Sequence, residues 1–285
     1  MTHDQRLSAT LHGQGSYQGQ AGIGLYRQWW RPAEPARAVL VLLHGLGDHS
    51  GLYGVLVERM VSHGLAVHAP DLRGNGQSAG RRGHVRRWSD FREDLRLLLR
   101  LVISEEGERP LFLMGNSLGG LIVLDYALYF PQGLRGVIAS APPLGDLGVP
   151  APLMALGRLF SRVLPGLTLP TGMDLSGLAR DPAVVAEALA DPLFHRLGSA
   201  RLSTETTAAI RRVHALAPRF PAPLLLLHGS ADRMVPPDGS RAFIAKVGHP
   251  DKQLREYPGA YHALFADIGG EQVLADLERW IEARW

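Results

Sequence analysis

Short apolar runs recur along the chain and alternate with longer segments whose apolar positions have helical spacing. The runs that we predict to be strands are residues 38–43, 65–69, 111–114, 136–140, 224–227 and 253–257. The predicted helices are residues 53–63, 89–104, 118–129, 238–247 and 271–283. Nearly continuous apolar strands separated by helices indicate a mostly parallel sheet with helices on both faces. Ligands on such a sheet bind beyond the carboxyl ends of its strands.

Two regions depart from this alternation. Residues near 8 to 31 combine scattered glycines with tyrosines and tryptophans, which is typical of antiparallel hairpin strands. Residues 144–221 are rich in Leu, Ala and Pro, contain no convincing strand, and begin with an apolar face at helical spacing. We therefore predict a core made of residues 1–143 and 222–285, with 144–221 inserted as a helical cap or lid. A plain helical packing layer is the alternative for the insertion.

Composition narrows the possible functions. The 285 residues include no cysteine, which excludes disulfides, thiol catalysis and cysteine-bound metals. The formal net charge is +3, and the one basic cluster, Arg81, Arg82, Arg86 and Arg87, reads as a solvated loop and helix start, so we expect no nucleic-acid partner. The first residues lack the apolar core of a signal peptide, and no apolar run is long enough to cross a bilayer. We expect a cytoplasmic protein that is at most peripheral to membranes.

The segment Gly115-Asn116-Ser117-Leu118-Gly119 matches the pattern G-x-S-x-G. An apolar strand precedes it and a helix follows, so the serine falls at a strand-to-helix turn. The flanking glycines remove side chains where strand and helix come close, so the serine can occupy a sharp, exposed turn. We interpret Ser117 as a nucleophile. An ordinary Gly/Ser loop is the alternative.

A serine hydroxyl needs a base to take its proton, and the base needs an orienting carboxylate. Asp232 follows the strand 224–227 and is our choice for the acid, whereas Asp238 and Asp251 read as solvated. His262 follows the last strand and is our choice for the base, whereas His249 precedes that strand. The order serine, acid, histidine is the one used by enzymes with this kind of turn.

Negative charge on the carbonyl oxygen must meet preformed N–H donors. We expect them from Leu118, directly after the nucleophile, and from Leu46, in the glycine-rich loop after the first parallel strand. Gly74, Gly76 and Ala79 formally match the dinucleotide pattern G-x-G-x-x-A, but no clean helix begins there. We therefore expect a structural turn, and neither a cofactor nor a metal.

These motifs together resemble the monoacylglycerol lipase and lysophospholipase branch of the α/β-hydrolase family, in its bacterial form. The likeness extends over nearly the whole chain. The blocks that carry it are residues 44–51, 71–78, 178–185, 191–194, 229–233 and 259–263. The two blocks at 178–185 and 191–194 are the more specific, because they lie in the inserted lid. One departure is Asn116, where that family usually has histidine. The resemblance implies an α/β-hydrolase fold and hydrolysis of an ester with one fatty chain, most simply a monoacylglycerol.

The lid composition suggests where the acyl chain binds. We predict that it lies along an apolar tunnel lined by lid residues, namely Leu147, Val149, Leu153, Met154, Leu156, Leu159 and Phe160. Four more methylenes would favour a longer ester roughly a hundredfold until the tunnel is full. An apolar lid would also contact membranes or micelles transiently. The alternatives are a generic carboxylesterase, a lysophospholipase, an acyltransferase with the same triad, or a hydrolase-fold binding protein. The sequence does not determine the oligomeric state.

Overall fold

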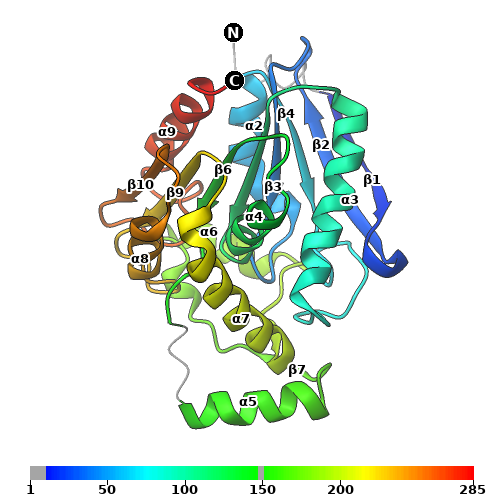
Figure 1. Ribbon diagram of the computed structural model, residues 1–285, viewed down its shortest axis with the longest axis vertical. Helices are drawn as coiled ribbons and strands as arrows, with labels where there is room; N and C mark the ends of the chain where they lie inside the picture. Colours follow the sequence, from blue (N-terminus) through cyan, green and yellow to red (C-terminus); the bar gives the residue numbers. More distant parts are fainter. Residues whose placement is uncertain (1–10, 147–150) are drawn as a thin grey trace.

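The computed structural model describes residues 11–146 and 151–285, except for the side chains of Ala151 and Met154. Its centre is an eight-stranded sheet in the order β1-β2-β4-β3-β5-β6-β9-β10 (Figure 1). The strands are β1 (Leu11–Gln18), β2 (Gly24–Arg31), β3 (Ala38–Leu43), β4 (Leu65–Pro70), β5 (Leu111–Asn116), β6 (Leu134–Ser140), β9 (Leu224–Gly229) and β10 (Lys252–Tyr257). The six strands from β4 to β10 pair in parallel, and the β1–β2 hairpin adds antiparallel to β4. This arrangement confirms the predicted parallel sheet and N-terminal hairpin.

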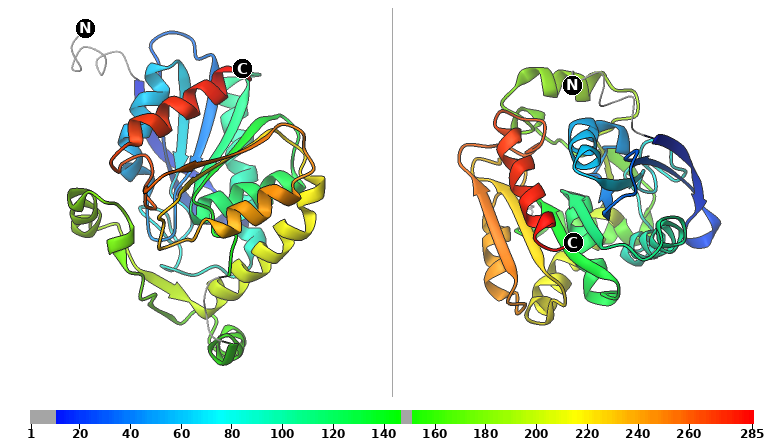
Figure 2. Two further views of the ribbon diagram at one scale, coloured as in Figure 1. Left: turned by 90° about the vertical axis from the view of Figure 1, so that its left-hand side faces the viewer. Right: turned by 90° about the horizontal axis from the view of Figure 1, so that it is seen from above.

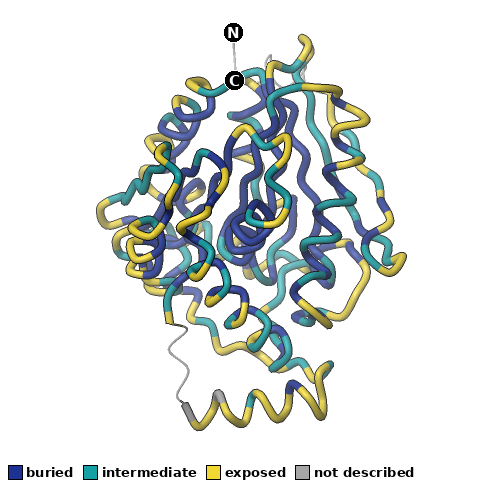
Figure 3. The backbone as a smooth tube through the Cα atoms, viewed as in Figure 1, coloured by how far each residue is buried: buried dark blue, intermediate teal, exposed yellow. Residues whose placement is uncertain are grey.

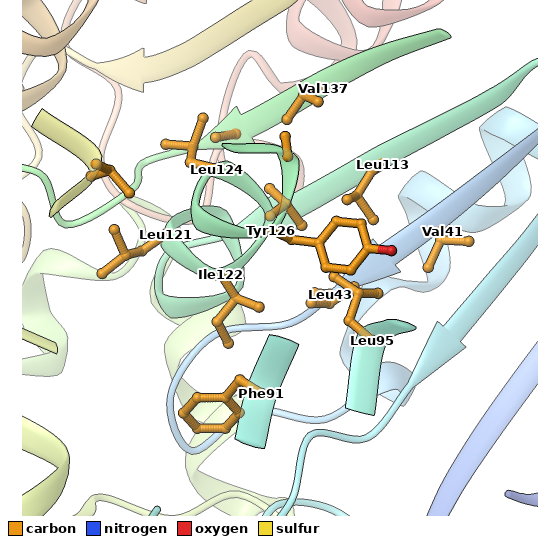
Figure 4. Packing of buried hydrophobic residues seen from close by; sticks show 14 of the residues in the cluster. Val41, Leu43, Phe91, Leu95, Leu113, Leu121, Ile122, Leu124, Tyr126 and Val137 are labelled. Carbon is orange, nitrogen blue, oxygen red and sulfur yellow. The ribbon is translucent and has the colours of Figure 1, made fainter. Parts of the chain in front are cut away.

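Helices cover both faces of this sheet. The helices of the core are α2 (Gly54–Ser62), α3 (Trp88–Glu106), α4 (Leu118–Tyr129), α8 (Asp238–Lys246) and α9 (Gly270–Glu282). One apolar cluster joins α3, α4 and α8 to one face, and a second joins α2 and α9 to the other. Figure 4 shows the first cluster, in which Ile122 and Tyr126 of α4 lie among side chains of α3 and the strands. The burial of alternate residues on opposite faces explains why an inner strand such as β3 is apolar throughout.

The region after β6 contains α5 (Ala151–Val163), β7 (Thr168–Pro170), the 3₁₀ turn η3 (Leu175–Gly177), α6 (Pro182–Ala190), β8 (Leu197–Ser199) and α7 (Ala200–Leu216). The expectation that it contains no strand was wrong, because β7 and β8 form a short antiparallel pair. Each of these strands has only three residues, too few for a period-two pattern to show. Helix α7 buries Ala209 and Val213 in the cluster around α4.

Helix α5 lies at the edge of the molecule, apart from the sheet (Figures 1 and 2). Its tube is mostly exposed, whereas that of α4 is buried along nearly its whole length (Figure 3). Ser161 joins α5 to α7 through a hydrogen bond of 2.9 Å between its Oγ and Thr204 Oγ1. Among the residues that the structure describes, no helix is long and apolar enough to span a membrane.

Candidate active site

Ser117 occupies a strained turn between β5 and α4, as the motif predicts. Its φ of 51° and ψ of −119° lie in a region that non-glycine residues rarely adopt, which costs about 1–3 kcal/mol. The glycines on either side, Gly115 and Gly119, are needed because neither position has room for a side chain. A Cβ on Gly115 would lie 2.2 Å from the Gly119 carbonyl oxygen, and one on Gly119 would lie 2.5 Å from the His44 carbonyl oxygen. Strand and helix therefore pack directly against each other, and the serine is forced into the turn.

The structure brings Asp232 and His262 together from two different loops. His262 Nδ1 donates to Asp232 Oδ2 over 2.7 Å, and both side chains are buried. Asp232 Oδ1 in turn accepts the backbone N–H groups of Met234 and Val235, both at 2.9 Å. Because Nδ1 carries a proton, the neutral imidazole has its lone pair on Nε2, as a general base requires.

Hydrogen bonds hold Asp232 in its ionised form. Burial alone would raise the pKa of this carboxyl, but hydrogen bonds from His228 and His262 outweigh burial and hold the pKa well below its usual range. His228 is fully buried and is itself fixed by the Val235 carbonyl at 2.8 Å and by Ser240 Oγ at 2.8 Å. A charged carboxylate beside His262 would stabilise an imidazolium on that ring.

The rival residues lie in other surroundings. Asp238 is largely exposed and pairs with Arg241, and Asp251 pairs with Arg284 at 2.6 Å. His249 Nδ1 accepts the backbone N–H of Asp251 and caps the start of β10. Each of them is engaged in local structure, which agrees with the choice of Asp232 and His262.

The loop after β3 is pinned around Leu46. His44 Nε2 accepts the Leu72 N–H at 2.8 Å, so its Nδ1 is the protonated nitrogen and donates to the Gly45 carbonyl at 2.7 Å. Burial lowers the pKa of His44, which keeps its ring neutral. Gly47 N donates to Asn75 Oδ1 at 3.1 Å. These contacts fix the backbone on both sides of Leu46.

The region after β6 also touches this loop. The His195 N–H donates to the Gly47 carbonyl at 3.0 Å, and His49 Nε2 lies 2.9 Å from Asp191 Oδ2. Gly47 has a φ of +80°, and a Cβ there would lie 1.9 Å from the His195 carbonyl oxygen. A glycine is therefore needed where the two segments meet.

Ser117, His262 and Leu46 line one cavity of about 290 Å³. The remaining wall is largely apolar and includes Leu52, Val55, Leu56, Met173, Leu175, Leu178, Val184, Phe194, Met234 and Phe265. Its polar part includes Asp48, Tyr53 and Asn116. The cavity lies at the carboxyl ends of β3, β5, β9 and β10, where the sheet rule places a ligand.

The residues predicted to line an acyl tunnel are not brought to this cavity. Leu153, Leu156, Leu159 and Phe160 lie on α5 with 56%, 47%, 57% and 38% of their surface exposed, and they are not part of the cavity wall. Leu147, Val149 and the side chain of Met154 lie outside the described residues. Helical spacing identified the apolar face of α5 but not what that face contacts. The part of the cavity wall that lies after β6 comes from η3, α6 and their flanking loops, which are shorter and less regular than α5.

Two clusters of charged residues outside the cavity are held by ion pairs and hydrogen bonds. His68, Glu105 and Glu106 are the one group in the described ranges whose atoms are close enough to share a metal ion. Arg27 pairs with Glu105, and Arg31 pairs with Glu106 at 2.6 Å, so the carboxylates already have cationic partners. In the basic cluster, Arg81 donates to the Gly166 carbonyl and Arg82 to the Gly76 carbonyl. The turn at Gly74 and Gly76 precedes no helix before α3, as expected.

Sequence reasoning missed Tyr53, Asp48 and the position of Asn116 in the cavity wall. Tyr53 was placed at the start of a helix, whereas it ends a 3₁₀ turn, Ser50–Tyr53, and lines the cavity. The signal in the sequence is the polar run Asp48-His49-Ser50, which follows the glycine-rich loop after His44.

Comparison with known proteins agrees with this geometry. The family model described as serine aminopeptidase, S33 (Hydrolase_4), matches residues 34–269. A monoacylglycerol lipase of Mycolicibacterium smegmatis is 34% identical, covering 96% of this chain and 99% of that protein. The crystal structure of Paleococcus ferrophilus monoacylglycerol lipase has a TM-score of 0.84 and 38% identity, covering 92% of this chain and 99% of the other.

A soluble variant of monoglyceride lipase from Saccharomyces cerevisiae, solved with a substrate analog, has a TM-score of 0.86 and 25% identity. The alignment covers 95% of this chain and 94% of the yeast chain. The match therefore spans the sheet and the region after β6 alike and is not limited to the serine turn. This chain belongs to the serine aminopeptidase S33 (Hydrolase_4) family of α/β-hydrolases, in its monoacylglycerol lipase branch.

Proposed function

We propose that this protein hydrolyses monoacylglycerols to fatty acid and glycerol through an acyl-serine intermediate. One observation carries the proposal: Ser117, held in a strained turn, shares an apolar cavity with His262, whose Nδ1 donates to a buried, ionised Asp232. The three relatives described above are monoacylglycerol or monoglyceride lipases, which supports the same class of substrate.

The proposed reaction follows from the roles of these three side chains. Ser117 Oγ attacks the ester carbonyl while His262 Nε2 takes its proton. The bond to the glycerol oxygen then breaks, and His262 returns the proton to that oxygen, which leaves the acyl group on Ser117. A water molecule then attacks the carbonyl of the acyl group while His262 Nε2 takes its proton. The bond to Ser117 Oγ breaks, the fatty acid departs, and the proton returns to Ser117 Oγ.

Two backbone N–H groups are proposed to hold the oxyanion. Leu118 begins α4, so its amide is a free helix N-terminal donor and the helix dipole adds to it. Leu46 lines the cavity in a loop that hydrogen bonds fix on both sides. Donors held in advance avoid reorganisation when the charge develops, and losing one such donor typically costs about 10²–10³ in kcat.

The apolar wall of the cavity is proposed to hold the acyl chain. Leu175, Leu178 and Val184 contribute to this wall, together with Met173 and Phe194. Each buried methylene contributes about 0.8 kcal/mol, so the rate should rise with chain length until the cavity is full. Residues 144–221 are proposed to act as a cap on the core, and part of the cavity wall comes from this region.

Helix α5 is proposed to contact the lipid aggregate that presents the substrate. Leu153, Leu156, Leu159 and Val163 are each at least 47% exposed on this helix, and monomeric proteins in water rarely leave a contiguous apolar surface of this kind uncovered. Arg158 and Arg162 lie on the same helix and suit a lipid–water interface. The protein is thereby expected to act peripherally at a membrane or micelle.

A chain-length series tests the proposal. Initial hydrolysis rates are measured on monoacylglycerols from short to long chain, beside di- and triacylglycerols, with Ser117→Ala as control. Rates that rise to a medium or long chain, with monoacylglycerol preferred, are the expected result. Activity confined to short chains would reduce the protein to a generic carboxylesterase. Absence of Ser117-dependent turnover on every ester would overturn the proposal.

A further inference from the structure

Asp48, a cavity residue outside the triad, has one carboxylate oxygen shared by two groups. Its Oδ2 accepts the Tyr53 hydroxyl proton at 2.9 Å and the Gly45 backbone N–H at 3.3 Å. Gly45 directly precedes Leu46. The carboxylate therefore connects a tyrosine on the cavity wall to the backbone of the loop that carries the proposed oxyanion donor.

Asn116 extends this connection to the nucleophile turn. Its side chain lowers the pKa of the Tyr53 hydroxyl, as a hydrogen-bond donor beside that oxygen would. Because the only proton of that hydroxyl is donated to Asp48, the hydroxyl must accept from Asn116, so Nδ2 faces Tyr53. Asn116 Oδ1 is then left buried with no hydrogen-bond partner among the described residues.

The space beside Gly45 is limited. A Cβ on Gly45 would lie 3.0 Å from Asp48 Oδ2 and 3.2 Å from Ser117 Cβ. The Asp48 carboxylate and the Ser117 side chain therefore both lie close to the Gly45 backbone. Because the Gly45 N–H donates to Asp48 Oδ2, the position of this carboxylate bears on the backbone that leads into Leu46.

We propose that Tyr53 is a positioning residue for the oxyanion hole. The relay Asn116 Nδ2–H to Tyr53 Oη–H to Asp48 Oδ2, which also accepts Gly45 N–H, ties the turn that carries Leu118 to the loop that carries Leu46. It fixes the separation of the two donors without contributing a donor of its own. The inference rests on the proposed roles of Ser117, Leu46 and Leu118.

The Tyr53 hydroxyl remains a donor throughout the working pH range. Burial raises its pKa well above the ordinary value, and the charge of Asp48 raises it further. The relay therefore needs no titration to operate, and its loss should not change the shape of the pH–rate profile.

Tyr53→Phe tests the relay, since it removes one oxygen and keeps the ring in the cavity wall. On a soluble p-nitrophenyl ester we expect kcat to fall about tenfold with KM within about twofold, since the interaction acts only on the transition state. The Ki of a trifluoromethyl ketone, which presents an oxyanion when bound, should rise by about the same factor. The Ki of a monoalkylglycerol ether, which presents none, should stay within about twofold. An equal rise in Ki for both inhibitors, or an unchanged kcat, would overturn the proposal.

A double-mutant cycle separates a relay from two independent contacts. Asn116→Leu removes the other end of the relay at similar volume, so adding it to Tyr53→Phe should cost less than the product of the single effects. Strict additivity would overturn the relay. If either variant fails to fold, Asp48→Asn weakens the shared acceptor and should give the same split between the two inhibitors. Because the ester here is artificial, these results do not depend on whether monoacylglycerols are the substrates.

Discussion

The turn at Ser117 and the helix α5 differ in what holds them in place. Around Ser117 the backbone itself is constrained: positive φ, glycines without room for a Cβ, and loops pinned by buried hydrogen bonds. Helix α5 has few such constraints, and its leucines face outward from the molecule. Under the proposed function, the first region requires a fixed geometry for transition-state charge, whereas the second requires only an apolar surface. Substitutions should therefore act through chemistry in the first and through access to aggregated substrate in the second.

The largest effect is expected at the nucleophile. Ser117→Ala should lower kcat by about 10⁵–10⁶ on every ester, soluble or aggregated, because no other group can form the acyl intermediate. Ser62→Ala, at an exposed helix end, is the matched control and should retain full activity. Steady-state rates on a soluble ester measure both. Residual activity within a hundredfold of wild type would mean that the reaction uses another nucleophile.

Asp232→Asn should lower kcat by about ten-thousandfold, because an amide cannot hold His262 in the required tautomer or stabilise its charged form. The control is Asp251→Asn, which loses only an ion pair with Arg284 and should change kcat less than about twofold. The check is to measure kcat of both variants across a range of pH. Similar rates for the two would remove Asp232 from the mechanism.

A substitution in the core away from the cavity should change the free energy of unfolding. Burial alone would raise the pKa of Glu106, but His68 and Arg31 outweigh it and lower the pKa from 4.5 to about 2. A lowered pKa contributes stability above about pH 4.5, and this contribution is lost as the pH falls towards about 2. Glu106→Gln should therefore unfold more easily at pH 7, by up to about 3 kcal/mol, with the gap closing in acid. Urea unfolding across this range measures the effect.

The exposed Glu271→Gln is the control for that experiment and should change the free energy of unfolding little at any pH. A gap for Glu106→Gln that stays constant from pH 7 to pH 3 would contradict the linkage.

The smallest expected effect lies in α5. Leu156→Ser combined with Leu159→Ser should lower the rate on micellar monoacylglycerol about fivefold, yet leave the rate on a short, monomeric ester within about twofold. Leu11→Ser, at an equally exposed leucine on β1, is the control and should affect neither rate. Vesicle sedimentation provides a second readout. An equal fall on both substrates would show that α5 serves the catalytic core after all.

The same contrast explains how much could be predicted from the sequence. Strands such as β3 are apolar throughout and bounded by turn residues, so they were located within one or two residues, and the serine turn followed from its two glycines. The pairing of β7 with β8 has three residues a side and leaves no periodic signal. The relay at Tyr53 depends on a side-chain geometry that only the fold creates, although Tyr53 and Asp48 lie close together in the chain.

The sequence placed α5 residues beside the substrate for a related reason, whereas the described ones lie outside the cavity wall. An apolar face at helical spacing indicates that one side of the helix contacts something apolar. It does not indicate whether that contact is a cavity or a lipid surface. Leu159 fits both, and only the packing of η3 and α6 against the core shows which residues enclose the cavity.

The central claim is that Ser117 is the nucleophile and His262 its base, and covalent labelling tests it most directly. The protein is treated with a fluorophosphonate, digested, and the modified peptide is identified by mass spectrometry. The account predicts a single adduct on Ser117, absent in Ser117→Ala and formed at least about a thousandfold more slowly in His262→Ala. An adduct on another residue, or labelling at an unchanged rate without His262, would contradict it.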